Sequence, residues 1–295
     1  MTRRPDIYYY KMMEHVHRRE TLLEVGFPLI VEPDNRLCIN GNNYFEDANI
    51  EKQKCRCRKT VSLLNENWFY ARNCRYHPLK VDKNSWTYKC CGKPFKSPGC
   101  VSSAFHTSSY ISLFGDWYVT KQWSTDNFNI LAMDCEFVFT QGGMEVARVS
   151  LVSLKKGVVY DTLVTPNYEI LDYNTQFSGI TPEDLAYGNV KTLSEVQYDL
   201  TCKFLSCDTI LIGHGLHSDL KGLHVCHENI IDTSILYPHF KGLPYRYSLE
   251  YLAQEYLGIT MRNGESGHCS IEDANICLQL VILKSELYPF QCYAT

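Results

Sequence analysis

The segment Leu131–Phe137, "LAMDCEF", places two acidic residues inside an apolar stretch that is otherwise typical of a buried strand. Side chains alternate between the two faces of a strand, so Asp134 and Glu136 would share one face, ~6–7 Å apart along the chain. Two like charges in an apolar strand are costly unless a positive group neutralises them. Such a pair is a weak signal by itself, because surface strands also contain it. The segment therefore predicts a strand whose acidic face requires a counter-charge.

The residues that follow this segment alternate between strand and helix patterns. Three strand-like runs with short connections come first, and helical runs then alternate with apolar strands. This order predicts an α/β domain with a mixed five-stranded sheet flanked by helices, and it matches a ribonuclease H-like fold. The expected strands are 130–140, 146–154, 157–165, 209–213 and 229–236, and the expected helices are 192–205, a segment starting near residue 218, 247–257 and 271–287.

The composition of the 295-residue chain changes at several points, which predicts its domain organisation. Residues 6–25 have the apolar spacing of one helix, and residues 34–53 are polar and irregular. No run approaches ~18 apolar residues, so we expect neither a membrane-spanning segment nor a membrane partner. The expected units are an N-terminal helical and irregular segment at 1–50, a Cys/His module at 51–110, a linker at 111–128 and the α/β domain at 129–288.

The net charge of −4 is unevenly distributed along the chain. Residues 51–100 contain twelve basic and three acidic residues, which gives this segment a charge of +9 and leaves −13 on the rest. A basic module on an acidic body is typical of some nucleic-acid-binding proteins, although a solvated basic surface would have the same composition.

Fourteen cysteines are many for a chain without an apolar secretory segment in its first residues. Outside the secretory pathway such cysteines are metal ligands or reduced thiols rather than disulfides. Eight Cys and His residues cluster between positions 55 and 106, enough for two tetrahedral structural zinc sites in a module with little core. The candidate zinc ligands are Cys55, Cys57, Cys74, His77, Cys90, Cys91, Cys100 and His106.

Adjacent Cys90 and Cys91 present a geometric problem within this Cys/His module. Neighbouring side chains diverge, so we expect the two thiolates to bind different zinc ions. The segment resembles the CHORD-type zinc modules. The resemblance lies in the strings "CRYHP", "KCCGKPF" and "GC", in Trp86 before the cysteine pair and in a final histidine. The spacing of the first cysteine pair departs from that pattern. Both RNA and a protein partner remain possible targets of the module.

Further acidic residues follow the first pair. In "GHCSIEDANICLQLV", His268 precedes a helix and Asp273 lies in its first turn, although an exposed histidine and a Ser270–Asp273 capping box would give the same pattern. In "GHGLHSDL", Asp219 begins a helix, where it could equally favour the helix dipole. Phosphodiester cleavage by two divalent ions requires several carboxylates around the metals, and Mg²⁺ or Mn²⁺ prefers such oxygen ligands.

The strings "MDCEF", "GHGLHSDL" and "GHCSIEDA", in this order, resemble the three exonuclease motifs of the DEDD superfamily in its histidine-bearing DEDDh branch. Within that branch the chain further resembles the Rex-type RNA exonucleases, the group that includes the GOR-like proteins. The strings that carry this resemblance are "ARVSLV", "VVYDTLVTP", "DYNTQFSGIT", "IIDTSILYPH" and "GLPYRYSLEYLA". The resemblance covers roughly residues 130–285. Phe137 stands where many relatives carry Met, a change that leaves every expected ligand intact.

This resemblance implies a metal-dependent 3′→5′ exoribonuclease that releases nucleoside 5′-monophosphates from single-stranded RNA. Asp134, Glu136, Asp219 and Asp273 would hold two Mg²⁺ or Mn²⁺ ions, and His268 would be the general base.

Asn174 and Phe177 would lie beside the terminal nucleotides, where Phe177 could stack on a base, although it could equally be a core residue. The resemblance also implies residence in the nucleus, with the cytoplasm as the alternative. A second hypothesis is a catalytically weak exonuclease-fold protein that acts through its zinc module as an RNA-binding or protein adaptor. The presence of all four carboxylates and His268 argues against it.

Overall fold

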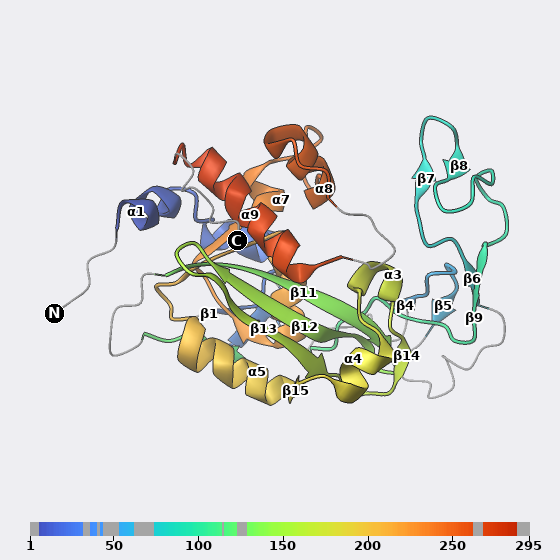
Figure 1. Cartoon of the computed structure of the whole chain (residues 1–295), viewed down its shortest axis with the longest axis horizontal. Coiled ribbons are helices and arrows are strands. Elements are labelled where there is room, and N and C mark those ends of the chain that lie inside the picture. The colour runs from blue at the N-terminus through green and yellow to red at the C-terminus, as the bar shows by residue number, and fades with distance from the viewer. Residues whose placement is uncertain are drawn as a thin grey trace.

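A mixed seven-stranded sheet forms the centre of the molecule (Figure 1). The computed structural model describes residues 6–31, 36–39, 42–43, 53–61, 74–113, 115–122, 129–261 and 268–287. The long strand β11 lies in the middle of the sheet, antiparallel to β12 and parallel to β16, in the order β15-β13-β12-β11-β16-β18, with β14 also paired to β11. The strands are β11 (Ile130–Thr140), β12 (Gly143–Ser153), β13 (Gly157–Thr165), β14 (Ile170–Asp172), β15 (Val190–Thr192), β16 (Ile210–Gly213) and β18 (Ile230–Asp232).

The mixed α/β class is confirmed, but two details of the sheet differ from the prediction. The structure adds β14 and β15, three-residue strands that are too short to produce a recognisable alternation. The expected fifth strand at 229–236 is only half strand, because helix α7 (Thr233–Leu236) starts directly after Asp232, whose carboxylate accepts a hydrogen bond from the backbone N–H of Ser234. A side-chain cap of this kind ends a strand where the apolar pattern continues.

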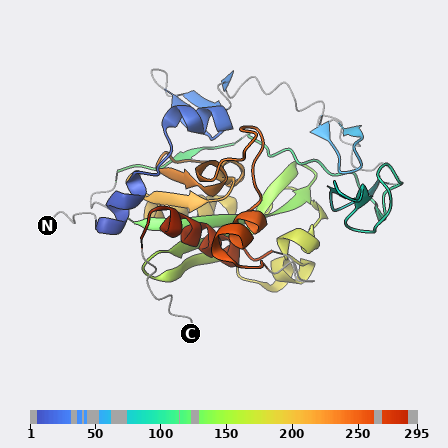
Figure 2. The same ribbon diagram turned by 90° about the horizontal axis from the view of Figure 1, so that it is seen from above.

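Helices cover both faces of the sheet because successive strand residues point in opposite directions. Ile130 and Ala132 pack with α1, α8 and α9, whereas Leu131 and Met133 pack with α2, α5 and α6. Figure 2 shows α9 running along one face of the sheet. The further helices are α1 (Ile7–Met13), α2 (Arg19–Val25), α3 (Thr175–Ser178), α4 (Pro182–Tyr187), α5 (Leu193–Asp199) with a π-helical turn at Leu200–Phe204, α6 (Leu216–Leu223), α8 (Leu249–Leu252) with a π-helical turn at Ala253–Leu257, and α9 (Ser270–Lys284).

The N-terminal segment packs into the core of the α/β domain. The single helix expected over 6–25 is two helices, because the backbone N–H of His17 leaves the helical path and donates to the carbonyl of Ile230, the first residue of β18. Met12 on α1 and Phe27 after α2 are fully buried, one against each face of the sheet. Residues 6–31 therefore fold as one unit with the α/β domain.

The segment predicted to be a linker also contacts the α/β domain where the structure describes it. Its strand β10 (Tyr118–Val119) pairs in parallel with β17 (Val225–Cys226), and the Trp117 ring stacks on His224 with centroids 4.7 Å apart. These contacts join the segment around Trp117–Val119 to the α/β domain.

The Cys/His module lies at the end of the molecule opposite α1 in both ribbon views (Figures 1 and 2). It consists of short antiparallel pairs with little apolar core. A further small sheet precedes it, and the predicted irregular stretch 34–53 otherwise falls largely outside the described residues. The strands of the preceding sheet are β1 (Leu29–Val31), β2 (Arg36–Ile39) and β3 (Asn42–Asn43). The strands of the module are β4 (Gln53–Lys54), β5 (Thr60–Val61), β6 (Cys74–Tyr76), β7 (Val81–Asp82), β8 (Thr87–Tyr88) and β9 (Val101–Ser103).

Among the described residues, no helix has the length and apolar character needed to cross a membrane.

Candidate active site and metal centres

The two acidic residues of β11 lie on the face that α9 covers. Glu136 is 7% exposed, and Asp134 is partly open to solvent. The β11–β12 register shifts between Glu136 and Phe137, so a bulge follows the acidic pair directly. Bulges of this kind redirect side chains beside functional sites. Glu136 Oε1 is buried and has no hydrogen-bond partner, which is costly unless another group satisfies it.

Asp219 comes to these acids from α6. Gly215, in the left-handed region at φ 74°, turns the chain from β16 into the helix, and the buried Asp232 carboxylate accepts hydrogen bonds from the backbone N–H groups of Gly215 and Leu216. Asp219 then accepts a 3.1 Å hydrogen bond from the backbone N–H of Cys135, between the two acids of β11. The carboxylate is therefore tied to the acidic strand rather than serving only the helix dipole.

Asp273 and His268 reach the same place from the start of α9. Asp273 is buried, and its Oδ2 lies 3.3 Å from Nδ1 of His268. The backbone N–H of His268 donates to the Phe177 carbonyl at 2.8 Å. Ser270 does not form the capping box that its spacing allows: the helix N-cap is Cys269, and the Ser270 hydroxyl bonds Ser150 instead.

The electrostatics of the site show how poorly the protein alone compensates these acids. Burial, with repulsion from Asp219 and Asp273, raises the pKa of Asp134 well above its usual range. Burial, with repulsion from Asp273, raises the pKa of Glu136 to about 8, and burial raises the pKa of Asp219 to about 7. The hydrogen bond to Asp273 raises the pKa of His268.

This donor set fits divalent cations. It is composed of hard carboxylate oxygens, it includes the buried unpartnered Glu136 Oε1, and its raised pKa values mark a deficit of positive charge. The cations that lower the pKa of Glu136 are His268 and Arg148, and the Arg148 guanidinium is already in a bidentate pair with Asp161 at 2.8 Å.

The predicted substrate residues lie beside His268. Phe177 is partly exposed rather than a core residue, and its ring centroid is 6.5 Å from that of His268. Asn174 precedes α3 in a left-handed conformation at φ 55°. The short helix α3 with its N-cap, called here the loop of Asn174–Ser178, therefore lies next to His268.

The eight candidate zinc ligands form two groups in which all potential ligand atoms lie within 4.8 Å of one another. Each group contains three thiols and one imidazole, a donor set that suits tetrahedral Zn²⁺. The first cluster is Cys55, Cys57, Cys74 and His106, and the second cluster is His77, Cys90, Cys91 and Cys100.

The expectation that Cys90 and Cys91 serve different ions is wrong. Both sulfurs lie 3.5 Å from Nδ1 of His77, in the same cluster. The two cysteines lie in a tight turn, in which the backbone N–H groups of Cys91 and Gly92 both donate to the Tyr88 carbonyl. Successive side chains diverge fully in a strand but not in such a turn, so adjacent thiols can face one ion.

The thiols of the second cluster are poised for a cation. Although burial opposes ionisation, hydrogen bonds from the Leu79 backbone and His77 lower the pKa of Cys90 to about 7. Partial desolvation and the hydrogen bond with Cys90 raise the pKa of Cys100 to about 11. The protein alone therefore stabilises one thiolate at the expense of its neighbour, whereas a bound zinc ion would favour all three.

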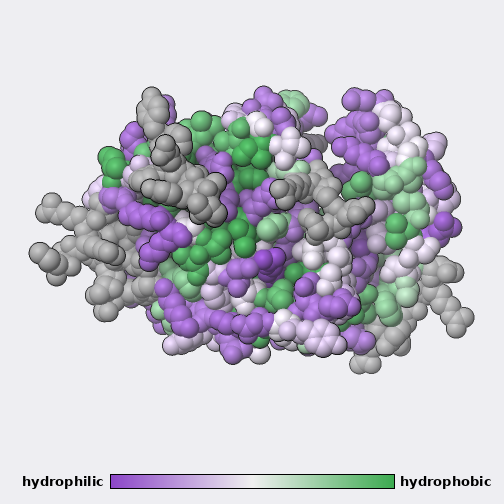
Figure 3. Space-filling model, in the orientation of Figure 1, coloured by the Kyte–Doolittle hydropathy of each residue, from purple (hydrophilic) through white to green (hydrophobic). Residues whose placement is uncertain are grey.

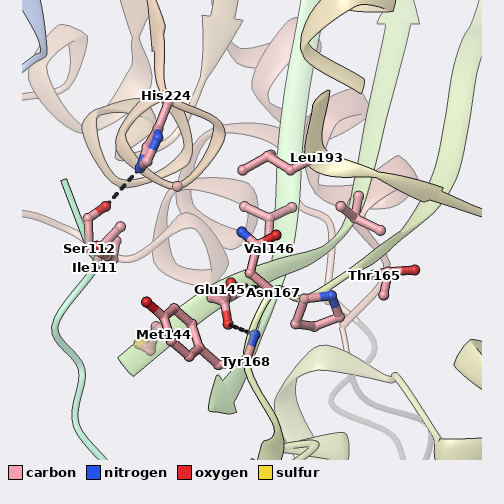
Figure 4. A pocket seen from close by; sticks show the side chains of 13 residues that line it. Ile111, Ser112, Met144, Glu145, Val146, Thr165, Asn167, Tyr168, Leu193 and His224 are labelled. Atoms are coloured by element: carbon pink, nitrogen blue, oxygen red, sulfur yellow. Dashed lines mark hydrogen bonds between the residues drawn. The ribbon is translucent and has the colours of Figure 1, made fainter. Parts of the chain in front are cut away.

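A separate cavity of about 560 Å³ lies between β12, β13 and α6 (Figure 4). None of the predicted site residues lines it. The Glu145 carboxylate at its wall accepts hydrogen bonds from the backbone N–H groups of Asn167 and Tyr168, so this acid is occupied in holding the chain. We assign the cavity no part in the site.

Sequence reasoning missed Asp232, which positions the turn before Asp219. The signal was present in "NIID", where an acid directly follows an apolar strand, and Asp232 is fully buried in the structure.

Four carboxylates and a histidine around the central strand of a ribonuclease H-like sheet define the class of metal-dependent nucleases. Residues 131–281, just over half of the chain, match the exonuclease family. The chain belongs to this family, and within it to the Rex-type RNA exonucleases of the DEDDh superfamily, as the sequence motifs predict.

Three curated relatives illustrate the similarity. Exonuclease GOR of Pan troglodytes is 37% identical over 94% of this chain and 42% of its own length. RNA exonuclease 1 homolog of Homo sapiens is 37% identical over 94% of this chain and 24% of its own length. RNA exonuclease 3 of Saccharomyces cerevisiae is 34% identical over 89% of this chain and 67% of its own length. The chain thus spans less than half the length of the first two.

Among solved structures, the Neurospora crassa Pan2 catalytic unit, with protease and nuclease domains, aligns with a TM-score of 0.48. The alignment has 26% identity and covers 61% of this chain and 31% of that chain. The fold assignment rests on the sheet topology and the family match.

The raised carboxyl pKa values predict how the stability of the cation-free protein depends on pH. Glu136 and Asp219 ionise near their ordinary pKa values of 4.5 and 3.8 when unfolded, but only at about 8 and about 7 when folded. The folded state therefore binds more protons between these limits, and the free energy of unfolding falls as pH rises from about 4 to 8. Thermal melts after dialysis, without chelators that remove zinc, check this. Mg²⁺ or Mn²⁺ should restore stability at pH 8.

Glu136→Gln should reduce both the pH dependence and the cation effect, because it removes the carboxyl whose pKa is raised to about 8. Asp116→Asn, at an exposed acid, should change neither. A cation-free melting temperature that does not depend on pH over this range would contradict the charge deficit.

The zinc clusters predict a specific pattern of metal loss. The native protein should hold about two zinc ions, and Cys90→Ser and Cys91→Ser should each hold about one, because both thiols serve the second cluster. The Cys90→Ser/Cys91→Ser double variant should still hold about one, whereas Cys55→Ser/Cys90→Ser should hold none. Mass spectrometry of metal content measures this. Loss of both ions from the first double variant would support the divided pair instead.

Proposed function

We propose that this protein is a metal-dependent 3′→5′ exoribonuclease that hydrolyses single-stranded RNA to nucleoside 5′-monophosphates. The observation that carries the proposal is the convergence of Asp134, Glu136, Asp219 and Asp273 with His268 at the central strand of an exonuclease-family domain. The sequence similarity to proteins named RNA exonucleases supports RNA as the substrate.

The four carboxylates would hold two Mg²⁺ or Mn²⁺ ions, which supply a lowered pKa for the attacking water and charge neutralisation at the phosphate. The residues of the chain do the remaining work. Asp273 holds His268 through Nδ1, so Nε2 is the nitrogen that would take the proton of the attacking water. The raised pKa of His268 keeps it basic enough for that transfer near neutral pH.

The loop of Asn174–Ser178 would bind the end of the RNA chain. Phe177 presents a partly exposed ring next to His268, where a base can stack on it irrespective of sequence. Such stacking would favour the last phosphodiester of the strand over an internal one at the acidic cluster.

The central test uses single-stranded RNA labelled at its 5′ end. With Mg²⁺ or Mn²⁺ the protein should shorten this RNA into a ladder, and the same RNA labelled at its 3′ end should release labelled mononucleotide from the start. Asp134→Asn should abolish shortening. His268→Ala should slow it about 10²–10⁴-fold, the usual contribution of a general base.

Asp116→Asn should retain activity. Release of mononucleotide from the 5′ end would contradict the direction, and binding of RNA without shortening would favour the adaptor hypothesis. A matched DNA strand measures the preference for ribose.

We further propose that the second zinc cluster presents a surface for RNA upstream of the active site. Trp86 is 61% exposed and Phe95 37% exposed, with ring centroids 5.7 Å apart. Exposed aromatic rings among lysines combine base stacking with phosphate attraction. Figure 3 shows the lobe with β7 and β8 as mainly hydrophilic. The exposed lysines of this surface are Lys80, Lys83, Lys89, Lys93 and Lys96.

Trp86→Ala should weaken binding of a 20-nucleotide RNA about tenfold, within the range of one lost base stack, and leave a trinucleotide unaffected. Fluorescence anisotropy with catalytically inactive Asp134→Asn protein measures both affinities. Tyr198→Ala is a matched control, because Tyr198 is also exposed and lies beside a lysine. Unchanged binding of the long RNA would contradict RNA binding at this surface and favour a protein partner.

Residence in the nucleus stays a prediction.

A further inference from the structure

Arg56 connects the first zinc cluster to the α/β domain. It lies between the ligands Cys55 and Cys57, so a metal ion at the cluster would fix the backbone on both sides of it. Its Nε donates to the Thr107 hydroxyl at 2.9 Å, and a terminal nitrogen donates to Asp172 Oδ2 at 2.6 Å. The side chains of the ion pair are only 17% and 26% exposed.

Two aromatic rings enclose the same guanidinium. Its central carbon lies 4.2 Å from the ring centroid of Tyr76 and 4.6 Å from that of Phe139. Tyr76 belongs to β6 of the module, and Phe139 belongs to β11, the strand that carries the acidic pair. A planar guanidinium can stack between rings while its edge donates hydrogen bonds, which lysine cannot do.

Asp172, the ion-pair partner of Arg56, also holds the start of the loop of Asn174–Ser178. Asp172 accepts Arg56 on Oδ2 and the backbone N–H of Asn174 on Oδ1, the latter at 2.7 Å. The Asn174 carbonyl in turn accepts hydrogen bonds from the N–H groups of Phe177 and Ser178. The Phe177 carbonyl accepts the N–H of His268. Consecutive hydrogen bonds thus run from the first zinc cluster to the loop that contains Phe177 and to His268.

We propose that Arg56 is a positioning residue for the 3′ end of the RNA. It is held by the Cys55-x-Cys57 turn, which a zinc ion at the first cluster would fix, and it orients Asp172. Asp172 in turn fixes the loop of Asn174–Ser178 so that Phe177 can stack on the terminal base. This inference rests on the proposed function of the same site. It makes binding of the RNA end depend on the first zinc cluster and not on the second.

Arg56 could instead only attach the module to the α/β domain, so the test needs a readout at the RNA end. The probe is single-stranded RNA with 2-aminopurine as its 3′-terminal base, whose fluorescence is quenched by stacking. The protein carries Asp134→Asn to prevent cleavage, and quenching is measured at saturating protein in Mg²⁺. Arg56→Ala should lose most of the quenching and raise the Kd about tenfold, as expected for one lost stack.

Arg75→Ala is the matched control, because Arg75 is an exposed arginine that follows a ligand of the same cluster. It should keep the quenching and the affinity. Arg56→Lys should recover part of the quenching, since it restores the charge but not the planar guanidinium that contacts the two rings. Asp172→Asn should resemble Arg56→Ala, and the double variant should lose little more than either.

The two clusters provide a second comparison. Cys55→Ser should lose the quenching, whereas Cys90→Ser should keep it at saturating protein even if its affinity for RNA is lower. The zinc content of Arg56→Ala should stay near that of the parent, which separates loop positioning from loss of the zinc cluster. Equal quenching in Arg56→Ala and Arg75→Ala would overturn the inference.

The proposed function fails in a different way. If the parent Asp134→Asn protein does not quench the probe and the native protein does not shorten RNA, the substrate assignment is wrong. If native cleavage and parental quenching are present but do not depend on Arg56, only the positioning role is wrong.

Discussion

Repulsion among buried carboxylates is the constraint on which the rest of this structure depends. Asp134, Glu136, Asp219 and Asp273 come from one strand and two helices. The raised pKa values of the first three show that their ionisation in the folded protein is costly. The apolar packing on both sides of the sheet keeps them together despite this cost. The fold is therefore less stable without cations, and the same carboxylates create a site that favours divalent cations. Functional sites commonly lower the stability of a fold in this way.

The sequence predicted the parts of this site that depend on alternation and motif order. Asp134 and Glu136 share a face because strand geometry requires it, and Asp219 and Asp273 came from their order along the chain. Interactions between distant segments were not predictable in the same way. Three such contacts are the hydrogen bond from Cys135 to Asp219, the hydrogen bond from Leu216 to Asp232 and the Arg56–Asp172 pair. They join residues far apart in sequence, and no periodicity predicts them.

In the zinc module, too, the residue types were predictable from the sequence but the contacts between them were not. Its eight ligands were recognisable by residue type, but their grouping was not, because the prediction treated Cys90 and Cys91 as neighbours in extended chain. The turn at Tyr88–Gly92 changes the relation between the two side chains. Likewise the predicted single N-terminal helix is interrupted at His17, where a backbone hydrogen bond to Ile230 outweighs local helical preference.

The burial of Phe27 in the α/β core has a consequence for the architecture of the whole chain. The nuclease domain is discontinuous: it begins with residues 6–31 and resumes near β10, so the zinc module is an insertion between two parts of one core. The described segments on both sides of the insertion pack into this one core. The core also becomes complete only when segments on both sides of the insertion meet, so the module lies within the loop that folding must close.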